Sequence, residues 1–167
     1  MAKKHWRTNQ TILLVGEGAD EEAFLNHVKS NFVLRGSGKS VKVKNAQGKG
    51  ATHVVEWTIR QMATAEYNTV AVMVDTDKDW TPAIQEKAAN KNILLLPSTP
   101  CFEAVMLRVL DQHPNGNAQT LKKLFAPFVH NKATESESYQ EHFSAGYLIA
   151  NRLRDGSINR LLQILGV

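Results

Sequence analysis

The sequence predicts a compact, mostly parallel α/β domain with helices on both faces of its sheet and a helical C-terminal segment. Two observations favour this class. Short apolar runs alternate with segments of helical periodicity, and the three strongest apolar runs each end in polar residues. Alternating strands and helices are typical of parallel sheets. With 167 residues, 43% of them hydrophobic, the chain fits one domain, residues 1–167, with an ordinary core.

Four strands are predicted. Residues 11–15, 70–74 and 93–96 are continuous apolar runs, as expected for strands that are buried on both faces. Residues 41–43 alternate between apolar and polar, which indicates a strand nearer the edge of the sheet.

The helices follow from periodicity and from start signals. One begins at about Asp20, because apolar residues recur at helical spacing from Phe24 to Phe32. Another has Thr99 as its N-cap and Pro100 as its first residue. The remaining helices are expected over residues 52–62, 81–89, 118–125, 138–153 and 157–165, with a turn at 113–117 and a loop at 130–137. We expect a core over about 11–112 and a helical extension over 113–167.

The composition of the chain limits which partners and which cellular compartment the sequence favours. The net charge of +4 is compatible with a phosphate-bearing partner and is equally compatible with an unremarkable surface. The one cysteine, Cys101, excludes an internal disulfide and is expected to be a buried small hydrophobe. The basic N-terminus, with Lys3, Lys4 and Arg7, precedes an apolar run that is too short for a signal peptide or a membrane span. These features favour a cytoplasmic protein without a membrane partner.

Acidic residues follow two of the predicted buried strands. Glu17 lies directly after residues 11–15, and Asp75 and Asp77 follow residues 70–74. The carboxyl ends of parallel strands meet at one edge of a sheet, where ligands bind. If the chain stays extended, Asp75 and Asp77 face one side, and a cation would relieve their repulsion. Hard oxygen ligands favour Mg²⁺ or Mn²⁺. The alternatives are a polar strand exit for Glu17 and a solvated acidic turn that includes Asp79.

Two further acids are candidates for the same site. Glu21 shares a helix face with Phe24 and should lean toward the sheet, whereas Glu22 should point to water. Glu103 lies in the first turn of a predicted helix and does not complete a capping box. Stabilisation of the helix dipole is an alternative role for each acid.

Four lysines form a basic stretch between the first two predicted helices. Lys39, Lys42, Lys44 and Lys49 have the charge to contact phosphates, and a solvated sheet edge is the alternative interpretation.

Three segments carry a resemblance to a known family. Residues 14–21 (LVGEGADE) resemble the glutamate motif of Toprim domains, and residues 72–77 (VMVDTD) resemble their Asp-x-Asp motif. Residues 98–107 (STPCFEAVML) are similar to the Asn-Pro-x-Phe-Glu-type segment of the RloB-like branch, which is associated with bacterial restriction and phage-defence loci. The resemblance covers roughly residues 11–112.

The resemblance implies a compact, Rossmann-like (Toprim-like) fold and Mg²⁺-dependent chemistry at a phosphodiester. By motif, Glu17 would be the general acid or base, and Asp75 and Asp77 would bind the metal. Glu21 and Glu103 would be acids specific to the branch. The expected function is that of a nuclease or nuclease subunit acting on nucleic acid in a defence system, with a possible protein partner from the same operon. The alternatives are a non-catalytic Toprim-like module that binds nucleic acid or a protein, and an enzyme for a small phosphorylated substrate.

Overall fold

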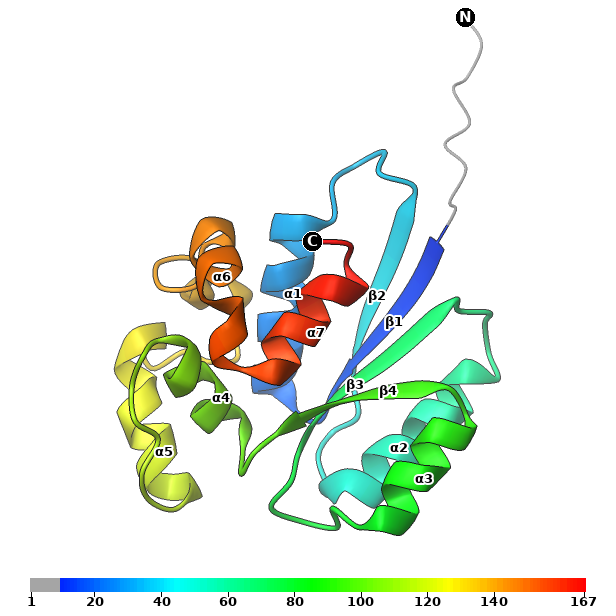
Figure 1. Cartoon of the computed structure of the whole chain (residues 1–167), viewed down its shortest axis with the longest axis horizontal. Helices are drawn as coiled ribbons and strands as arrows, with labels where there is room; N and C mark the ends of the chain where they lie inside the picture. Colours follow the sequence, from blue (N-terminus) through cyan, green and yellow to red (C-terminus); the bar gives the residue numbers. More distant parts are fainter. Residues whose placement is uncertain (1–9) are drawn as a thin grey trace, which may run out of the picture.

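A four-stranded, all-parallel sheet forms the centre of the computed structural model, which describes residues 10–167 (Figure 1). Its strands are β1 (Gln10–Gly16), β2 (Lys39–Asn45), β3 (Thr69–Asp75) and β4 (Ile93–Ser98), and they lie in the order β2-β1-β3-β4. The predicted α/β fold class is confirmed. The basic N-terminus noted above falls in residues 1–9, outside the described residues.

Burial explains which strands are central. β1 and β3 are apolar on both faces, and most of their residues are fully buried. β2 alternates apolar with lysine and lies at one edge, as predicted, although it extends beyond residues 41–43 at both ends. β4 forms the other edge.

Helices cover both faces of the sheet (Figure 1). One face is covered by α2 (Gly50–Met62) and α3 (Pro82–Asn90). The other is covered by α1 (Ala19–Phe32), α4 (Phe102–Val109), α5 (Ala118–Phe125), α6 (Ala145–Asn151) and α7 (Gly156–Ile164). Three short 3₁₀ helices complete this second layer: η1 (Ala126–Val129), η2 (Ser136–Tyr139) and η3 (Arg152–Arg154).

The C-terminal segment is part of the main core. An aromatic cluster joins it to the N-terminal helix: the ring centroid of Phe24 lies 5.5 Å from that of Tyr139 and 6.0 Å from that of Phe143. Phe102 of α4 and Phe125 of α5 belong to the same cluster, with centroids 6.1 Å apart. Residues 113–167 therefore complete the hydrophobic layer against one face of the sheet, rather than lying outside a finished core.

Two predicted helices differ from the structure. α4 begins at Phe102 instead of Pro100, because the backbone N–H of Thr76 donates to the carbonyls of Ser98 (3.0 Å) and Pro100 (3.2 Å) and holds this segment beside the end of β3. The continuous helix predicted over 138–153 is also wrong. Ser144 caps a new helix there, α6, by accepting the N–H of Tyr147 at 3.3 Å.

Within residues 10–167, no helix is both long enough and apolar enough to cross a membrane.

Candidate functional site

The site lies where the chain changes direction across the sheet. From β1 the chain crosses to β2 on one side and then returns to β3 on the other side. Ligands of open α/β sheets bind at such a switch point, outside the carboxyl ends of the strands. Glu17 directly follows β1, and Asp75 is the last residue of β3. The topology thus places two of the predicted site residues on either side of the switch point.

Glu17 is fixed by backbone donors from two neighbouring segments. Its Oε2 accepts the N–H of Asp75 at 2.8 Å, and its Oε1 accepts the N–H of Gly50, the first residue of α2, at 3.3 Å. Its own N–H donates to the carbonyl of Met73 at 3.0 Å and continues the pairing of β1 with β3. Both side-chain contacts come from N–H groups, so they suit an ionised carboxylate, which only accepts hydrogen bonds.

Gly16 allows α1 to start this close to the strand. A Cβ atom at position 16 would lie 2.8 Å from the Cβ of Glu21 and 2.8 Å from the backbone nitrogen of Glu22. Neither neighbour is the end of a flexible side chain. Because Gly16 has no side chain, α1 can begin close to the end of β1, and its first turn lies over the site.

Asp75 is the least satisfied acid of the site. Its Oδ1 is buried and has no hydrogen-bond partner within residues 10–167. The other such atom is Oγ of Ser98, the residue paired with Asp75 in the register of β3 and β4. Buried polar atoms are nearly always hydrogen-bonded, so the orphaned oxygen of Asp75, a residue that lines the cavity described below, points to a ligand at this edge.

Burial and neighbouring charge both oppose ionisation here. Desolvation, followed by the charges of Glu21 and Glu17, raises the pKa of Asp75 to about 8. Desolvation also raises the pKa of Glu21 to about 7, and the charges of Glu17 and Asp20 add to the effect. A bound cation would reverse the balance and favour the ionised carboxylates.

The two acids in the first turn of α1 differ in position. Glu21 is 6% exposed, leans toward the sheet as predicted, and accepts the N–H of Gly18 at 3.1 Å. It therefore also caps the helix. Glu22 was expected to point to water, but it is half-buried, because its Oε2 accepts a hydrogen bond from Asn45 of β2 at 3.1 Å.

Five predicted acids line a single cavity of about 390 Å³: Glu17, Glu21, Asp75, Asp77 and Glu103. Asp77 is exposed at the rim, whereas Glu103 is 4% exposed. Asp79, expected to be solvated, is exposed and does not line the cavity. The site therefore combines two buried carboxylates, those of Glu21 and Glu103, with the half-buried Glu17 and Asp75 and the exposed Asp77.

Sequence reasoning missed two cations and one acid at this cavity. Lys78, Lys122 and Asp20 also line it. Lys122 Nζ lies 4.0 Å from Glu103 Oε1, and most of the lysine side chain is exposed. Lys78 follows Asp77 directly, so its position in the sequence was a usable signal. Lys122 comes from α5, whose place over the site no local pattern reveals.

The four lysines of the predicted basic stretch do not line the cavity. Lys39 donates from Nζ to the carbonyl of Leu165 near the C-terminus, and Lys44 donates to Gln61 Oε1 at 2.7 Å. Lys42 and Lys49 are exposed. The structure thus spreads these lysines along β2 and the loop that follows, instead of gathering them at the carboxylates.

Cys101 is buried, as expected, and it too lines the cavity. It precedes α4 as the N-cap residue. Burial raises the pKa of its thiol to about 12, so it remains protonated at neutral pH. Mg²⁺ and Mn²⁺ prefer oxygen ligands to sulfur, so the carboxylates are the relevant donors for such an ion.

The donor set suits a hard divalent cation. Within residues 10–167, no three His, Cys, Asp or Glu side chains are already arranged to hold a metal ion. The carboxylates nevertheless share one cavity, and Asp75 Oδ1 is buried without a partner. Oxygen donors of this kind fit Mg²⁺ or Mn²⁺, with Asp75 and Asp77 as the residues that would hold the ion.

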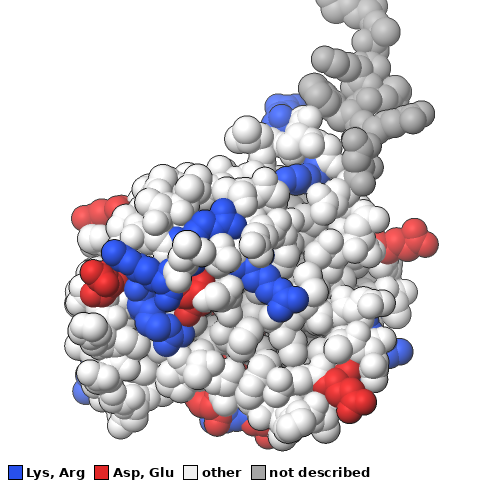
Figure 2. Space-filling view, in the orientation of Figure 1, with Lys and Arg blue, Asp and Glu red and all other residues white. Residues whose placement is uncertain are grey.

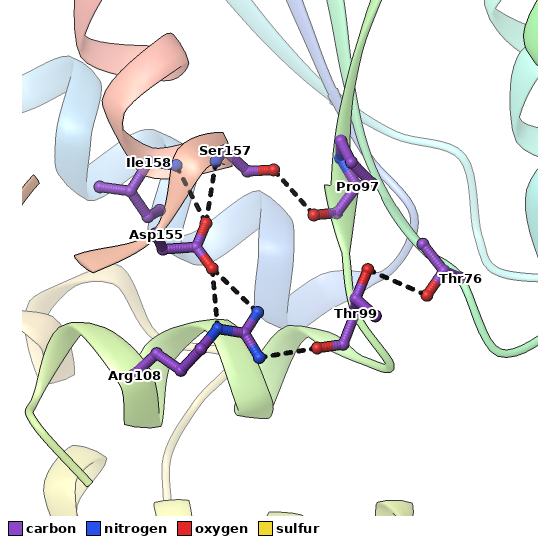
Figure 3. Close-up of polar contacts among 7 residues, drawn as sticks. All are labelled: Thr76, Pro97, Thr99, Arg108, Asp155, Ser157 and Ile158. Carbon is purple, nitrogen blue, oxygen red and sulfur yellow. Dashed lines mark hydrogen bonds and ion pairs between the residues drawn. The ribbon is translucent and has the colours of Figure 1, made fainter. Parts of the chain in front are cut away.

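A partly buried ion pair fastens the C-terminal segment beside the site (Figure 3). Arg108 of α4 donates from Nε and Nη2 to Asp155 Oδ2 at 3.0 and 2.8 Å, and from Nη1 to the carbonyl of Thr99 at 2.8 Å. Asp155 Oδ1 accepts the backbone N–H groups of Ser157 and Ile158 at the start of α7.

The same network reaches the edge of the sheet where Asp75 lies. Ser157 Oγ donates to the carbonyl of Pro97 in β4 at 2.7 Å (Figure 3). Thr99 contacts Thr76, the residue after Asp75, through a 3.2 Å hydrogen bond between hydroxyls. The ends of β3 and β4 are therefore held in place from the C-terminal helices.

Comparisons of the chain with protein-family models, with curated proteins and with solved structures found no match. The Toprim-like, RloB-like assignment stays a prediction from the sequence.

Proposed function

We propose that this protein is a divalent-metal-dependent phosphodiesterase acting on nucleic acid, a nuclease or a nuclease subunit. The observation that carries the proposal is the convergence of five acids on one cavity, with Asp75 Oδ1 buried and without a partner. The resemblance to RloB-like Toprim domains supports the same reaction class and suggests a role in bacterial defence.

The metal would be Mg²⁺ or Mn²⁺, held by Asp75 and Asp77. When bound, such an ion neutralises charge on the non-bridging oxygens of a phosphodiester and favours a nucleophilic water. Glu21 and Glu103 would add negative charge that attracts the ion. Lys78 and Lys122, at the same cavity, would meet the negative charge of the substrate phosphate.

Glu17 would move the proton. Its Oε1 makes the longer of its two backbone contacts, 3.3 Å against 2.8 Å for Oε2. Oε1 is therefore the oxygen that can accept a proton at least cost to the local structure. The shorter bond to the N–H of Asp75 keeps the carboxylate oriented between the ends of β1 and β3.

The test is calorimetric titration of Mg²⁺ and Mn²⁺ into the wild-type protein and into Asp75→Asn and Asp77→Asn. We expect binding in the wild type and its loss, or a large weakening, in both variants. Asp79→Asn is the matched control: it removes an acid two residues from Asp77, outside the cavity, and asparagine tolerates the positive φ of 55° at that position. The control should bind as the wild type does.

The same variants, incubated with labelled DNA and RNA in Mg²⁺, test the reaction. Metal-dependent cleavage that is absent in Asp77→Asn and normal in Asp79→Asn is the expected result. Nucleic-acid binding without cleavage by the wild type would instead favour the non-catalytic module. Glu17→Gln is a weaker test, because an amide cannot accept from both Asp75 and Gly50 as the carboxylate does, so the variant also disturbs the fold.

A further inference from the structure

Four arginines gather on one face of the C-terminal segment and the end of α4. Arg108 and Arg160 line the same cavity, of about 360 Å³, together with the first residues of α7. Arg154 donates to the carbonyl of Val109, the neighbour of Arg108, at 3.0 Å. Arg152 donates to the side chain of Asn159, the neighbour of Arg160, at 2.6 Å. Figure 2 shows basic side chains gathered over these elements. We refer to Arg108, Arg152, Arg154 and Arg160 as the arginine face.

Little negative charge opposes this face. Residues 145–167 contain three arginines, and Asp155 is the one Asp or Glu among them. The Asp155 carboxylate is 7% exposed and already accepts from Arg108 and from the start of α7. Asp111 lies 3.7 Å from Arg154, but its side chain is 77% exposed, so solvent screens that pair. Within the described residues, Arg152 and Arg160 form no ion pair with an Asp or Glu side chain.

Hydrogen bonds hold two of these guanidinium groups, those of Arg152 and Arg154, in place. Arg152 donates to the main-chain oxygens of Val167 and Asn159 at 2.9 and 3.2 Å. Arg154 donates to the hydroxyl of Tyr147 at 3.3 Å in addition to Val109. A guanidinium has five N–H donors, so each group keeps donors for an outside acceptor. Arginines that are held in place and keep free N–H donors are well suited to phosphate oxygens.

The arginine face is connected to the end of β3. Arg108 donates to the carbonyl of Thr99, and Thr99 bonds to Thr76, next to Asp75. A polyanion that lies across the arginines would therefore be positioned by the same network that holds the ends of β3 and β4. The lysines along β2 have no such connection to the carboxylates.

We propose that the arginine face is the surface on which the phosphate backbone of a nucleic acid binds, guiding the strand toward the carboxylate cavity. This inference rests on the proposed function, since it names where the substrate of that site is held. The contacts involve phosphates and not base edges, so binding is expected to depend strongly on salt and only weakly on sequence.

The experiment measures the binding of a short fluorescein-labelled DNA duplex and a short labelled RNA strand by anisotropy, over a range of salt concentrations, in EDTA. The test variant is Arg154→Gln with Arg160→Gln. The control is Arg60→Gln with Lys91→Gln, which removes the same charge from exposed positions on α2 and after α3, on the opposite face of the sheet. We expect the test variant to bind at least about tenfold more weakly. The slope of log K against log salt should fall by about one for each phosphate that the variant no longer neutralises.

Single Arg160→Gln keeps the test valid if the double variant is poorly folded, because Arg160 is exposed and makes none of the backbone contacts of Arg152 and Arg154. Equal affinity of the test and control variants would overturn the proposal, as would absence of binding to both nucleic acids. Poly-glutamate can be added as a competitor at the same concentration of negative charge as unlabelled nucleic acid. If it displaces the labelled nucleic acid equally well, the proposal is overturned in favour of an acidic protein partner. Because binding is measured without metal, these outcomes are separate from a failure of Asp75 and Asp77 to bind Mg²⁺.

Discussion

Asp75 ends a buried strand with an oxygen that has no partner, and its surroundings disfavour its charge. Its pKa rises from an ordinary 3.8 to about 8 on folding. Between these values the folded state keeps a proton that the unfolded state releases. The stabilisation this proton provides is complete below about pH 4 and is lost as pH rises through about 8. The metal-free protein should therefore lose stability over the upper part of this range.

The cleanest window runs from about pH 7 to 8. It lies above the ordinary pKa of 6.5 of His27, which burial lowers further, and below the ordinary pKa of 9.0 of the Cys101 thiol, which burial raises. In urea unfolding with EDTA, we expect the free energy of unfolding of the wild type to fall across it. Saturating Mg²⁺ should reduce the slope, because the cation replaces the proton. The same slope with and without Mg²⁺ would contradict a metal site at Asp75.

Asp75→Asn should stabilise the metal-free protein. The amide removes the charge that Glu17, Glu21 and burial oppose, while keeping the shape of the side chain. At about pH 8.5 in EDTA we expect a gain on the order of 1 kcal/mol in unfolding free energy, measured by urea denaturation. Asp79→Asn, on the exposed side of the turn, should leave stability nearly unchanged. A less stable Asp75→Asn protein would mean that the carboxylate has a structural role.

At the scale of elements, the contact of β1 with the start of α1 determines the geometry of the site. Gly16→Ala would place a Cβ 2.8 Å from backbone and Cβ atoms of α1. We expect a reduction of about 1–3 kcal/mol in unfolding free energy, since the helix must shift. Gly146→Ala in α6 meets nothing within 4 Å and should be neutral or stabilising by up to about 1 kcal/mol. Thermal denaturation followed by circular dichroism distinguishes the two variants.

Elements with strong local signals were predicted well from the sequence. The apolar runs of β1 and β3 and the Thr81–Pro82 start of α3 were enough to place these elements. The predicted helix over 138–153 failed, because the buried Tyr139 hydroxyl donates to the carbonyl of Ala133 and the chain turns there. Tertiary contacts determine the conformation of that segment, and the local periodicity of the sequence carries no information about them.

The acids of the site were predictable for a similar reason. They follow strands, and the carboxyl ends of parallel strands meet. Lys122 was not predictable, because its approach to Glu103 depends on how α5 packs across α4. The lysines of β2 do not gather at the carboxylates, since alternation along the strand and a helix partner such as Gln61 separate them.

At the scale of the molecule, the Arg108–Asp155 pair attaches the C-terminal helices to the sheet. Arg108→Ala would leave the Asp155 carboxylate, 7% exposed, without its charged partner. We expect a reduction of about 2 kcal/mol in unfolding free energy, because the buried carboxylate keeps its backbone donors but loses its charged hydrogen bonds. Lys87→Ala is the comparison: it breaks an exposed pair with Glu56, and the reduction should stay below about 1 kcal/mol. Equal effects of the two variants in urea denaturation would show that the pair does not fasten the segment.

The dependence of the main core on residues 113–167 has a consequence for how the protein is made. The four strands and their acids emerge from the ribosome first. At that stage one face of the sheet is not yet covered by the later core residues Leu121, Phe125, Tyr139 and Leu161. At about 5–20 residues per second, residues 113–167 take several seconds more to appear. During that interval the uncovered face of the sheet exposes apolar residues of the nascent chain, to which chaperones can bind. The acidic cavity can therefore mature only after residues 113–167 have been made.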